Sequence, residues 1–541
     1  MNASTDEQSY GEVFTRRWVV DTLLDLIGYV PSEPLHRRVI VEPSVGSGAF
    51  LGAIVARLLQ SAAQHSVDPS ALGPCVRAYD LQDEHVQACR ALVTRALVAA
   101  GAAQEAAEGI SAQWVSTTDF LLDDVSPSAD FVVGNPPYIR SDDLTLEQQA
   151  GYRQRWSTMR GRVDIYIGFF ERSLGILKPG ARLGFICADR WMRNAYGANL
   201  RELVGARYSI ETLWQMHDVD AFEEQVSAYP AITVLANRQQ GEVVVVDTNA
   251  TFGAPDAVRA VEFLDSGQSE LRTPAFSAHR MGSWFTGRGL WPTGSPDRIA
   301  LLEDLNERFR PLEDAAKRTK IGIGVATGAD KAYIVDGDTD VEPERKLPLV
   351  MADDIRTGSF HWRGKVLLNP WNADGTLVRL QDYPRFWAAL EAHPAIRTRF
   401  VAKKNPQTWH RTIDKVDASL TDRPKLLLQD MKATIQPVYD AGGFYPHHNL
   451  YYIVSEDWDL EVLGGILLSR IAQAFIEAYG VRMRGGTLRF QAQYLRKIRV
   501  PNPQDIPDDV ARRLVEAFKL RDPDAATRAA EAAYGIPEGT L

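Results

Sequence analysis

The 541-residue chain has little cysteine and no long apolar segment. Its three cysteines, Cys75, Cys89 and Cys187, are too few and too far apart for a disulfide framework or a structural zinc site. Apolar runs such as Val243–Val246 are much shorter than the ~20 residues of a membrane span. The N-terminus is polar and charged and has no secretory signal. We therefore expect a protein of the reducing cytoplasm, with no metal site and no membrane segment.

The chain also lacks an excess of positive charge. Its 60 Lys and Arg residues oppose 70 Asp and Glu residues, which gives a formal net charge of −10. With 45% hydrophobic and 24% charged residues, the composition is typical of folded globular proteins and not of disordered tails. An acidic balance argues against a broad basic surface. It does not exclude a local basic cleft, because net charge does not locate the cations.

The length is about three times that of a typical domain of ~150 residues, so we expect more than one domain. Between residues 39 and 237, strand-like segments (VIVEP, VRAYD, FVVGNPP, RLGFICA and AITVLAN) alternate with helical or polar intervals. This alternation predicts an α/β fold with a doubly wound, mostly parallel sheet. Beyond it, Gly and Pro punctuate short strands and helices, as in an irregular α+β module. The predicted parts are a first domain over 1–260, a linker over 261–304, a second domain over 305–505 and a helical tail over 506–541.

The first strand ends in an acidic residue and a glycine turn. Glu42 and Pro43 are followed by Gly46 and Gly48, at the edge of the sheet where such folds bind ligands. A dinucleotide-binding fingerprint would have a third glycine where this chain has Leu51, so the turn is not specialised for a pyrophosphate. The carboxylate of Glu42 beside the turn suits a cationic or amine-bearing ligand.

The next two strands also end in carboxylates. Asp80 closes VRAYD, at the position where these folds bond ribose hydroxyls. Asp119 and Phe120 follow one strand later, where an adenine ring can be hydrogen-bonded and packed. A single Asp after a strand is more often a turn or helix cap than a ligand. The order of these residues along successive strands is what indicates a binding site.

A buried strand then runs directly into Asn135-Pro136-Pro137-Tyr138. Two consecutive prolines fix φ and remove two backbone donors, so the loop is stiff and its carbonyl groups are left as acceptors. A simple strand-ending turn explains the two prolines but assigns no role to Asn135 or Tyr138. The sequence therefore predicts a rigid acceptor loop at the same edge of the sheet.

These motifs resemble those of the S-adenosylmethionine-dependent adenine-N6 DNA methyltransferases of the TaqI-like (gamma) group. Glu42–Leu51 is similar to the family's cofactor motif and Asn135–Tyr138 to its catalytic loop. Weaker similarities at Ile321–Gly328 and Arg484–Gln491 extend to the family's C-terminal target-recognition domain. The resemblance covers most of the chain. It implies a class I methyltransferase domain followed by a DNA-binding domain.

The resemblance also implies roles for particular residues. Gly11–Thr15 is similar to the family's N-terminal cofactor motif, whose Thr contacts the methionine carboxylate. Phe222 falls where the target-base loop carries an aromatic residue, shortly before Ser227–Leu235, which resembles the next strand of the family. The expected cofactor-binding residues are Thr15, Glu42, Pro43, Gly46, Gly48, Asp80, Asp119 and Phe120, and the expected catalytic residues are Asn135, Pro136, Tyr138 and Phe222.

The exocyclic amine of adenine is a poor nucleophile because its lone pair is delocalised into the ring. We expect the side-chain oxygen of Asn135 and the carbonyl of Pro136 to accept hydrogen bonds from this amine and to favour a pyramidal nitrogen. A base inside a duplex cannot reach the loop, so the target adenine must be flipped out. Tyr138 and Phe222 would then stack on it.

Binding to double-stranded DNA needs cations even on an acidic chain. Positive charge is concentrated at Arg397–Lys432, with nine Lys and Arg against four Asp, and at Arg482–Arg499, with six against none. A solvated helix face explains many such runs, but glycines among arginines suit a loop that approaches phosphates. The predicted DNA-contacting residues are Lys403, Lys404, Arg482, Arg484 and Arg489.

Several alternatives stay open. A protein-glutamine methyltransferase could use the same loop, although it does not need a large second module with basic clusters. RNA base methylation is also chemically possible, and only a substrate assay separates it from DNA methylation. A cytosine-N4 enzyme usually carries Ser where this chain has Asn135. A non-catalytic DNA-binding scaffold is a further possibility, disfavoured by the intact loop. We prefer a stand-alone, monomeric modification enzyme of a type II restriction-modification system, with any cognate endonuclease on a separate chain.

Overall fold

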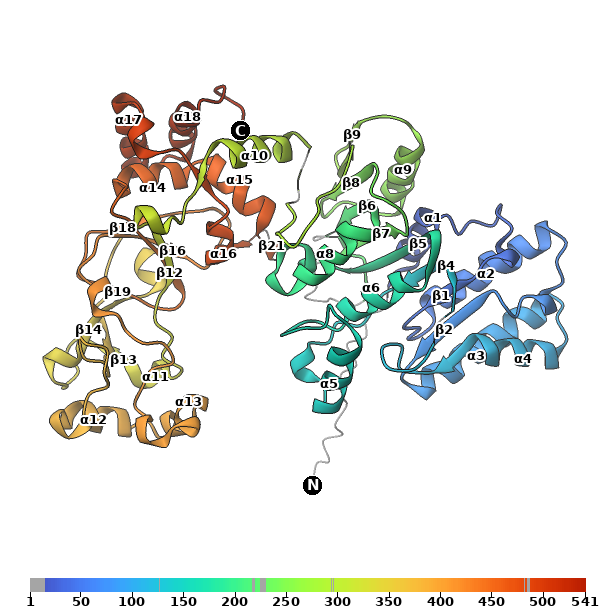
Figure 1. The fold of residues 1–541 in the computed structure, drawn as a ribbon, viewed down its shortest axis with the longest axis horizontal. Helices are drawn as coiled ribbons and strands as arrows, with labels where there is room; N and C mark the ends of the chain where they lie inside the picture. The colour runs from blue at the N-terminus through green and yellow to red at the C-terminus, as the bar shows by residue number, and fades with distance from the viewer. Residues whose placement is uncertain are drawn as a thin grey trace. The chain divides into compact units, whose positions relative to one another are not determined.

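The computed structural model describes residues 15–125, 127–216, 219–223, 230–292, 294, 296–480, 482–483 and 487–541. The chain forms two compact units, Met1–Pro296 and Asp297–Leu541, which we call unit 1 and unit 2 (Figure 1). Each unit has its own sheets and its own apolar core.

Unit 1 is built on a ten-stranded mixed sheet in the order β3-β2-β1-β4-β5-β7-β6-β8-β10-β9. Neighbouring strands from β3 to β5 run parallel, whereas β7 lies antiparallel between β5 and β6. The predicted α/β fold class of a doubly wound sheet is confirmed. The strands are β1 (Ile40–Glu42), β2 (Val76–Asp80), β3 (Val115–Thr117), β4 (Ala129–Gly134), β5 (Leu177–Ala188), β6 (Ser209–Gln215), β7 (Pro230–Ala236), β8 (Val243–Thr248), β9 (Glu270–Arg272) and β10 (Phe276–Met281).

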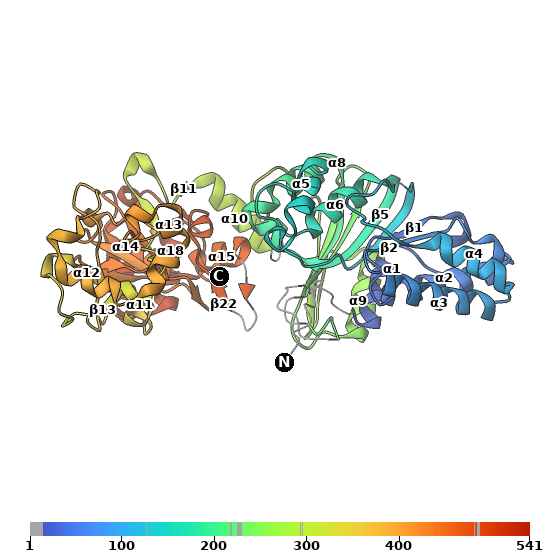
Figure 2. The same ribbon diagram turned by 90° about the horizontal axis from the view of Figure 1, so that it is seen from below.

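Helices cover both faces of this sheet because its central strands are apolar on both sides. Successive side chains of a strand point to opposite faces. Accordingly, Val133 of β4 packs into one apolar cluster with α1 and α9, while the adjacent Val132 packs into another with α6 and α8 (Figure 2). The helices of unit 1 are α1 (Arg17–Leu26), α2 (Ala49–Gln64), α3 (Asp83–Ala99), α4 (Gln104–Trp114), α5 (Leu146–Arg155), α6 (Tyr166–Gly175), α7 (Arg190–Arg193), α8 (Ala198–Arg207) and α9 (Ala254–Asp265).

Gly101, with a φ of 104°, lies between α3 and α4 and separates them. Residues 261–304, which the sequence predicted as a linker, hold β9 and β10 of the sheet and most of α10 (Pro296–Arg308). Strand β10 pairs with β8, about 30 residues earlier in the chain. Such pairing leaves no local pattern in the sequence, because it depends on contacts between distant segments.

Unit 2 is an irregular α+β assembly of several small sheets. Two four-stranded sheets have the orders β12-β20-β16-β18 and β13-β15-β14-β19, and smaller sheets join β17-β22-β21 and β11-β23. The strands are β11 (Arg310–Pro311), β12 (Lys320–Ile323), β13 (Ile334–Asp336), β14 (Lys346–Val350), β15 (Lys365–Leu368), β16 (Lys425–Gln429), β17 (Met431–Lys432), β18 (Val438–Asp440), β19 (Tyr445–Pro446), β20 (Leu450–Val454), β21 (Arg482–Met483), β22 (Thr487–Arg489) and β23 (Arg499–Val500).

The helices of unit 2 after α10 are α11 (Asp330–Tyr333), α12 (Pro384–Glu391), α13 (Phe400–Lys404), α14 (Leu460–Leu468), α15 (Arg470–Tyr479), α16 (Ala492–Leu495), α17 (Asp508–Leu520) and α18 (Pro523–Tyr534). Residues 460–479 form two helices, α14 and α15, although their apolar pattern is continuous. Ser469 divides them, because its hydroxyl donates to the Ile466 carbonyl at 2.6 Å and caps α15. Among the described residues, no single helix is long and apolar enough to cross a membrane, and only α14 and α15 together, bent by 63°, reach that length and composition.

The tail after Pro507, which the sequence predicts as one or two amphipathic helices, forms two, α17 and α18. They pack against α14 within unit 2. The close approach requires glycine, since a Cβ at Gly465 would lie 2.5 Å from the Leu514 carbonyl oxygen.

Candidate active site

The strand order of the unit 1 sheet changes direction at β1, which pairs with β2 on one side and β4 on the other. Loops that follow the carboxyl ends of parallel strands open into one crevice at such a switch point. A cavity with about 960 Å³ of empty space, part of it open to solvent, lies there. Its lining includes these predicted site residues: Thr15, Glu42, Pro43, Gly46, Asp80, Asp119, Phe120, Asn135, Pro136 and Tyr138.

The glycine turn after β1 is held by the carboxylate of Asp80. The backbone N–H of Gly46 donates to Asp80 Oδ2 at 2.8 Å, and that of Gln82 donates to Oδ1 at 2.9 Å. Gly46 has a φ of 48°, and a Cβ there would meet nothing within 4 Å, so the turn presents bare backbone to the cavity. Gly48 (φ 89°) begins α2 and does not line the cavity; it faces Cys89 instead.

The side chain of Glu42 is buried at the end of β1, with 1% of its surface exposed. Neither carboxylate oxygen has a hydrogen-bond partner among the described residues. Burial raises the pKa of Glu42 well above its ordinary value, and the nearby charge of Asp80 raises it further. A buried, unpaired carboxylate is unfavourable unless a ligand compensates it. The cavity therefore suits a ligand that carries positive charge, as the sequence predicts.

Asp119 serves both as a cap and as part of the cavity wall. Its Oδ1 accepts from the backbone N–H groups of Leu121 and Leu122, at 2.8 and 3.1 Å. Its Oδ2 accepts from the hydroxyl of Tyr152 at 2.9 Å. Tyr152 comes from α5 and also lines the cavity, and no motif in the sequence marks it. Only the folded chain brings this hydroxyl next to Asp119.

Phe120, which the sequence predicts to pack against a bound adenine ring, itself packs against two other aromatic side chains. Its ring centroid lies 5.7 Å from that of Tyr79 and 5.5 Å from that of Phe169, with which it stacks. Both distances are typical of favourable aromatic pairs. Phe120 and Phe169 line an apolar side of the cavity together with Asp119, and Tyr79 packs against Phe120 without lining the cavity.

The Asn-Pro-Pro-Tyr loop is tied to the cofactor motifs by two hydrogen bonds. The side-chain nitrogen of Asn135 donates to the Thr15 hydroxyl at 3.2 Å, and the Ser44 hydroxyl donates to the Asn135 carbonyl at 3.2 Å. Pro136 is buried, and the Tyr138 hydroxyl lies 3.5 Å from the Ile186 carbonyl. Burial raises the pKa of Tyr138 well above its ordinary value, so this hydroxyl stays protonated. The loop thus sits directly beside the glycine turn.

Phe222 is placed next to Thr15 but not in the cavity lining. The two residues form an isolated antiparallel bridge, and Phe222 packs in an apolar cluster with 3% of its surface exposed. Residues 11–14 and 227–229 of the expected family motifs lie outside the described residues.

The predicted DNA-contacting residues differ in their surroundings. Lys403 and Lys404 are exposed at the end of α13, and within the described part of the chain no carboxylate forms an ion pair with them. Arg489 is paired with Asp430, which raises its pKa. Arg484 and the side chain of Arg482 lie outside the described residues.

Known proteins are similar to this chain along nearly its whole length. The Eco57I restriction-modification methylase family matches residues 100–222, and the TaqI-like C-terminal specificity domain matches residues 381–500. The Type II methyltransferase M.PaeR7I of Pseudomonas aeruginosa is 43% identical over 534 residues, which cover 98% of this chain and 92% of the relative. The chain belongs to the Type II methyltransferases. The predicted function as a restriction-modification DNA methyltransferase, with a TaqI-like C-terminal domain, is thereby confirmed.

Other Type II methyltransferases are similar over the same length. M.XhoI of Xanthomonas vasicola is 41% identical over 537 residues, with 98% of this chain and 97% of the relative covered. Among solved structures, this Type II methyltransferase is similar to the restriction-modification enzyme MmeI in complex with DNA, with a TM-score of 0.62. The similarity covers 97% of this chain and 73% of the MmeI chain. At 12% sequence identity this likeness supports the fold alone.

Proposed function

We propose that this Type II methyltransferase transfers a methyl group from S-adenosylmethionine to N6 of a flipped adenine in double-stranded DNA. The observation that carries the proposal is the placement of the Asn135-Pro136 corner and the buried carboxylate of Glu42 in one cavity. One side of the cavity suits a cationic donor, and the other offers acceptors to an amine.

The residues of the cavity fit S-adenosylmethionine. It supplies a methyl group on a positively charged sulfur and also carries an ammonium group. The carboxylate of Glu42 would compensate this positive charge. Its two oxygens have no hydrogen-bond partner among the described residues. Asp80 would bond the ribose and Asp119 the adenine edge, with Phe120 packed against the ring. Thr15, Pro43 and Gly46 would complete the binding site, and Gly48, outside the cavity lining, would shape the turn before α2.

Asn135 and Pro136 would activate the target amine. Their oxygen atoms accept hydrogen bonds from N6 and stabilise the positive charge that develops on it during transfer. The hydrogen bond from the Asn135 amide to Thr15 supports this role, because it fixes how the side chain is turned. The two prolines restrict the backbone dihedral angles of the loop. Little reorganisation of the loop is therefore needed when the target base binds.

Extrusion of the base costs a few kcal/mol of lost stacking and pairing. Tyr138, half-buried on the loop, would recover part of this energy by stacking on the base. Phe222 would do the same only after it leaves its apolar cluster.

Unit 2 would read the target sequence, since its residues 381–500 match a specificity domain. We further propose that the enzyme acts as a monomer in the cytoplasm and that any cognate restriction endonuclease is a separate chain.

Single-molecule sequencing of DNA from cells that express this chain tests the proposal. Modified adenines confined to one sequence motif are expected, and they should disappear when Asn135→Ala is expressed at the same level. Unmodified adenines alongside modified cytosines would overturn the adenine assignment.

Lys403→Ala/Lys404→Ala should make DNA binding less sensitive to salt. Each phosphate contact contributes about 0.9 to the slope of log K against log salt, so the loss of two should reduce the slope by about 2. Fluorescence anisotropy over a salt series measures it. Lys519→Ala, which removes an exposed lysine paired with Glu461, is the matched control. An unchanged slope in the double variant would exclude this pair as a phosphate contact.

Tyr152→Phe should weaken cofactor binding with little effect on kcat. The change removes one hydrogen bond to Asp119, worth about 0.5–1.5 kcal/mol, so the Kd for S-adenosylmethionine should rise roughly 2- to 10-fold. Isothermal titration calorimetry gives the Kd, and Tyr439→Phe in β18 serves as the control. Equal affinity in wild type and Tyr152→Phe would remove Tyr152 from the binding site.

A further inference from the structure

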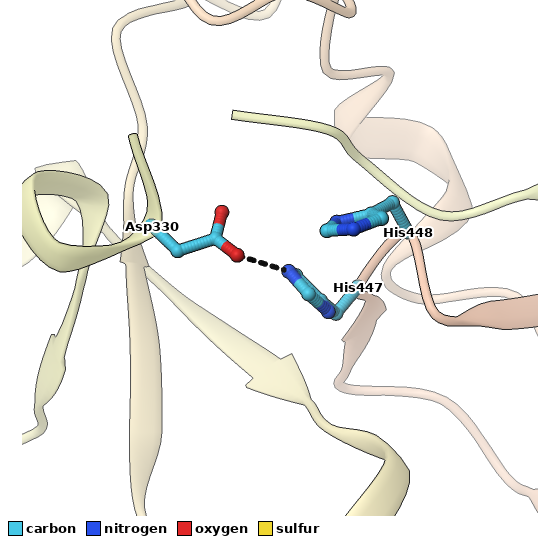
Figure 3. A group of neighbouring side chains, drawn as sticks. All are labelled: Asp330, His447 and His448. Atoms are coloured by element: carbon cyan, nitrogen blue, oxygen red, sulfur yellow. Dashed lines mark hydrogen bonds and ion pairs between the residues drawn. The ribbon is translucent and has the colours of Figure 1, made fainter. Parts of the chain in front are cut away.

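Unit 2 contains a cluster of one aspartate and two histidines, Asp330, His447 and His448 (Figure 3). One potential ligand atom from each residue lies within 4.8 Å of those of the other two. His447 Nε2 is 3.2 Å from Asp330 Oδ2, and the ring centroids of the two histidines are 4.0 Å apart. Figure 3 shows both rings extending from their chain segment toward the side where the Asp330 carboxylate lies.

The segment that carries the histidines is fixed by backbone contacts. The N–H of His447 donates to the Val350 carbonyl at 3.0 Å, and that of His448 donates to the Val325 carbonyl at 3.1 Å. Gly324 permits this approach, because a Cβ there would lie 2.2 Å from the Pro446 carbonyl oxygen. The two rings are therefore held by the fold and not by a flexible loop.

The carboxylate is also oriented. The hydroxyl of Thr327, a residue with no exposed surface, donates to Asp330 Oδ1, which leaves Oδ2 directed at His447. Hydrogen bonds of this kind commonly hold metal ligands in position. The Asp330 side chain remains 44% exposed, so solvent reaches one side of the cluster.

A structural hydrogen bond between Asp330 and His447 would explain only part of this arrangement. It gives no reason for the ring of His448 to lie against that of His447. The Nδ1 atom of His448 is buried and has no hydrogen-bond partner among the described residues, whereas His447 turns its Nε2, and not its own buried Nδ1, toward Asp330. A polar atom left in this way is unfavourable unless a ligand satisfies it.

We propose that Asp330, His447 and His448 bind a divalent transition-metal ion of the zinc class. Two imidazoles and a carboxylate suit Zn²⁺, Co²⁺ or Ni²⁺, whereas Mg²⁺ prefers a shell of oxygen atoms. Three protein ligands leave a coordination position for water on the exposed side. The ion would join the segment after β12 to the segment between β19 and β20. The sequence predicted no metal, because Asp330 lies 117 residues from His447 and no metal-binding spacing is present.

The test uses the untagged full-length chain, dialysed against a small excess of Zn²⁺ and then against metal-free buffer. Bound zinc is measured by plasma mass spectrometry, and Co²⁺ titration monitors the visible absorption of the coordinated ion. Asp330→Asn and His448→Gln remove single ligands without altering the buried His447. His393→Gln, at an exposed histidine elsewhere in unit 2, is the matched control.

Wild type and His393→Gln should retain about one zinc per chain and show the Co²⁺ band, and a large excess of Mg²⁺ should not displace either ion. Each ligand variant should lose at least about 10-fold in affinity. Zinc at ~100 times its wild-type Kd should also raise the thermal transition of wild type by roughly 5–10 °C and that of His448→Gln by at most about half as much. If wild type retains no more zinc than the ligand variants, the cluster is a structural Asp–His contact and the proposal fails.

Discussion

Asn135→Ala is expected to lower kcat for methyl transfer by about 10²–10³-fold, the usual effect of removing one hydrogen-bonding group aimed at developing charge. The substitution deletes the side-chain acceptor for the target amine and the contact with Thr15. It leaves the Glu42 carboxylate and the glycine turn intact, so the Kd for S-adenosylmethionine should change little. Transfer of a tritiated methyl group to DNA gives kcat, and calorimetry gives the Kd.

Asn502→Ala, at a half-buried asparagine of unit 2, controls for general effects of the substitution. It should keep wild-type turnover. Turnover by Asn135→Ala within a factor of three of wild type would contradict the proposed role of the Asn-Pro-Pro-Tyr loop, provided that the variant binds the cofactor normally.

Glu42→Gln should have opposite effects on binding and on stability. A hydrogen bond to a charged group is worth about 1.5–3 kcal/mol, so the Kd for S-adenosylmethionine should rise roughly 10- to 150-fold. The free energy of unfolding of the cofactor-free protein should increase at neutral pH, because the variant no longer buries a carboxylate without a described partner. Calorimetry measures the affinity and chemical denaturation the stability. Glu307→Gln, at an exposed position of α10, should change neither.

The stability difference should depend on pH in a defined direction. The folded pKa of Glu42 is raised above its ordinary value of 4.5. The folded chain therefore holds this proton more tightly than the unfolded chain, and stability falls as the pH rises from about 4.5 toward the raised pKa. Glu42→Gln lacks this dependence, so its advantage should grow across that window. An unchanged affinity for the cofactor would contradict the assignment of Glu42.

The sequence could predict those parts of the site that are encoded in short segments. A strand, its terminal carboxylate and the turn after it are contiguous, so Glu42 and Asn135 could be placed at the same edge of the sheet. The parallel pairing of β1 with β4 then brings them into one cavity. Asp119 also acts as the turn cap that a single Asp after a strand commonly forms. One of its carboxylate oxygens accepts from the backbone of that turn, and the other accepts from the hydroxyl of Tyr152.

Features that depend on distant contacts could not be predicted in this way. Tyr152 reaches Asp119 from a helix that shows no distinctive pattern. Strand β7 lies between β5 and β6 and runs antiparallel to both. Its continuous apolar sequence is compatible with either direction, so the sequence does not predict this reversal. Ser469 ends α14 inside a continuous apolar pattern, because its hydroxyl competes with the backbone for hydrogen bonds. Phe222, expected to face the target base, packs in the apolar cluster beside Thr15.

The central claim is that the Asn135-Pro136 corner activates the exocyclic amine of an adenine in DNA. Its most direct test is to incubate the purified chain with S-adenosylmethionine and unmethylated duplex DNA, digest the DNA to nucleosides and identify the methylated product by mass spectrometry. We predict N6-methyladenine as the methylated nucleoside, formed by wild type and about 10²–10³-fold more slowly by Asn135→Ala. Formation of N4-methylcytosine, or of no methylated nucleoside on DNA that contains the recognition sequence, would contradict the account.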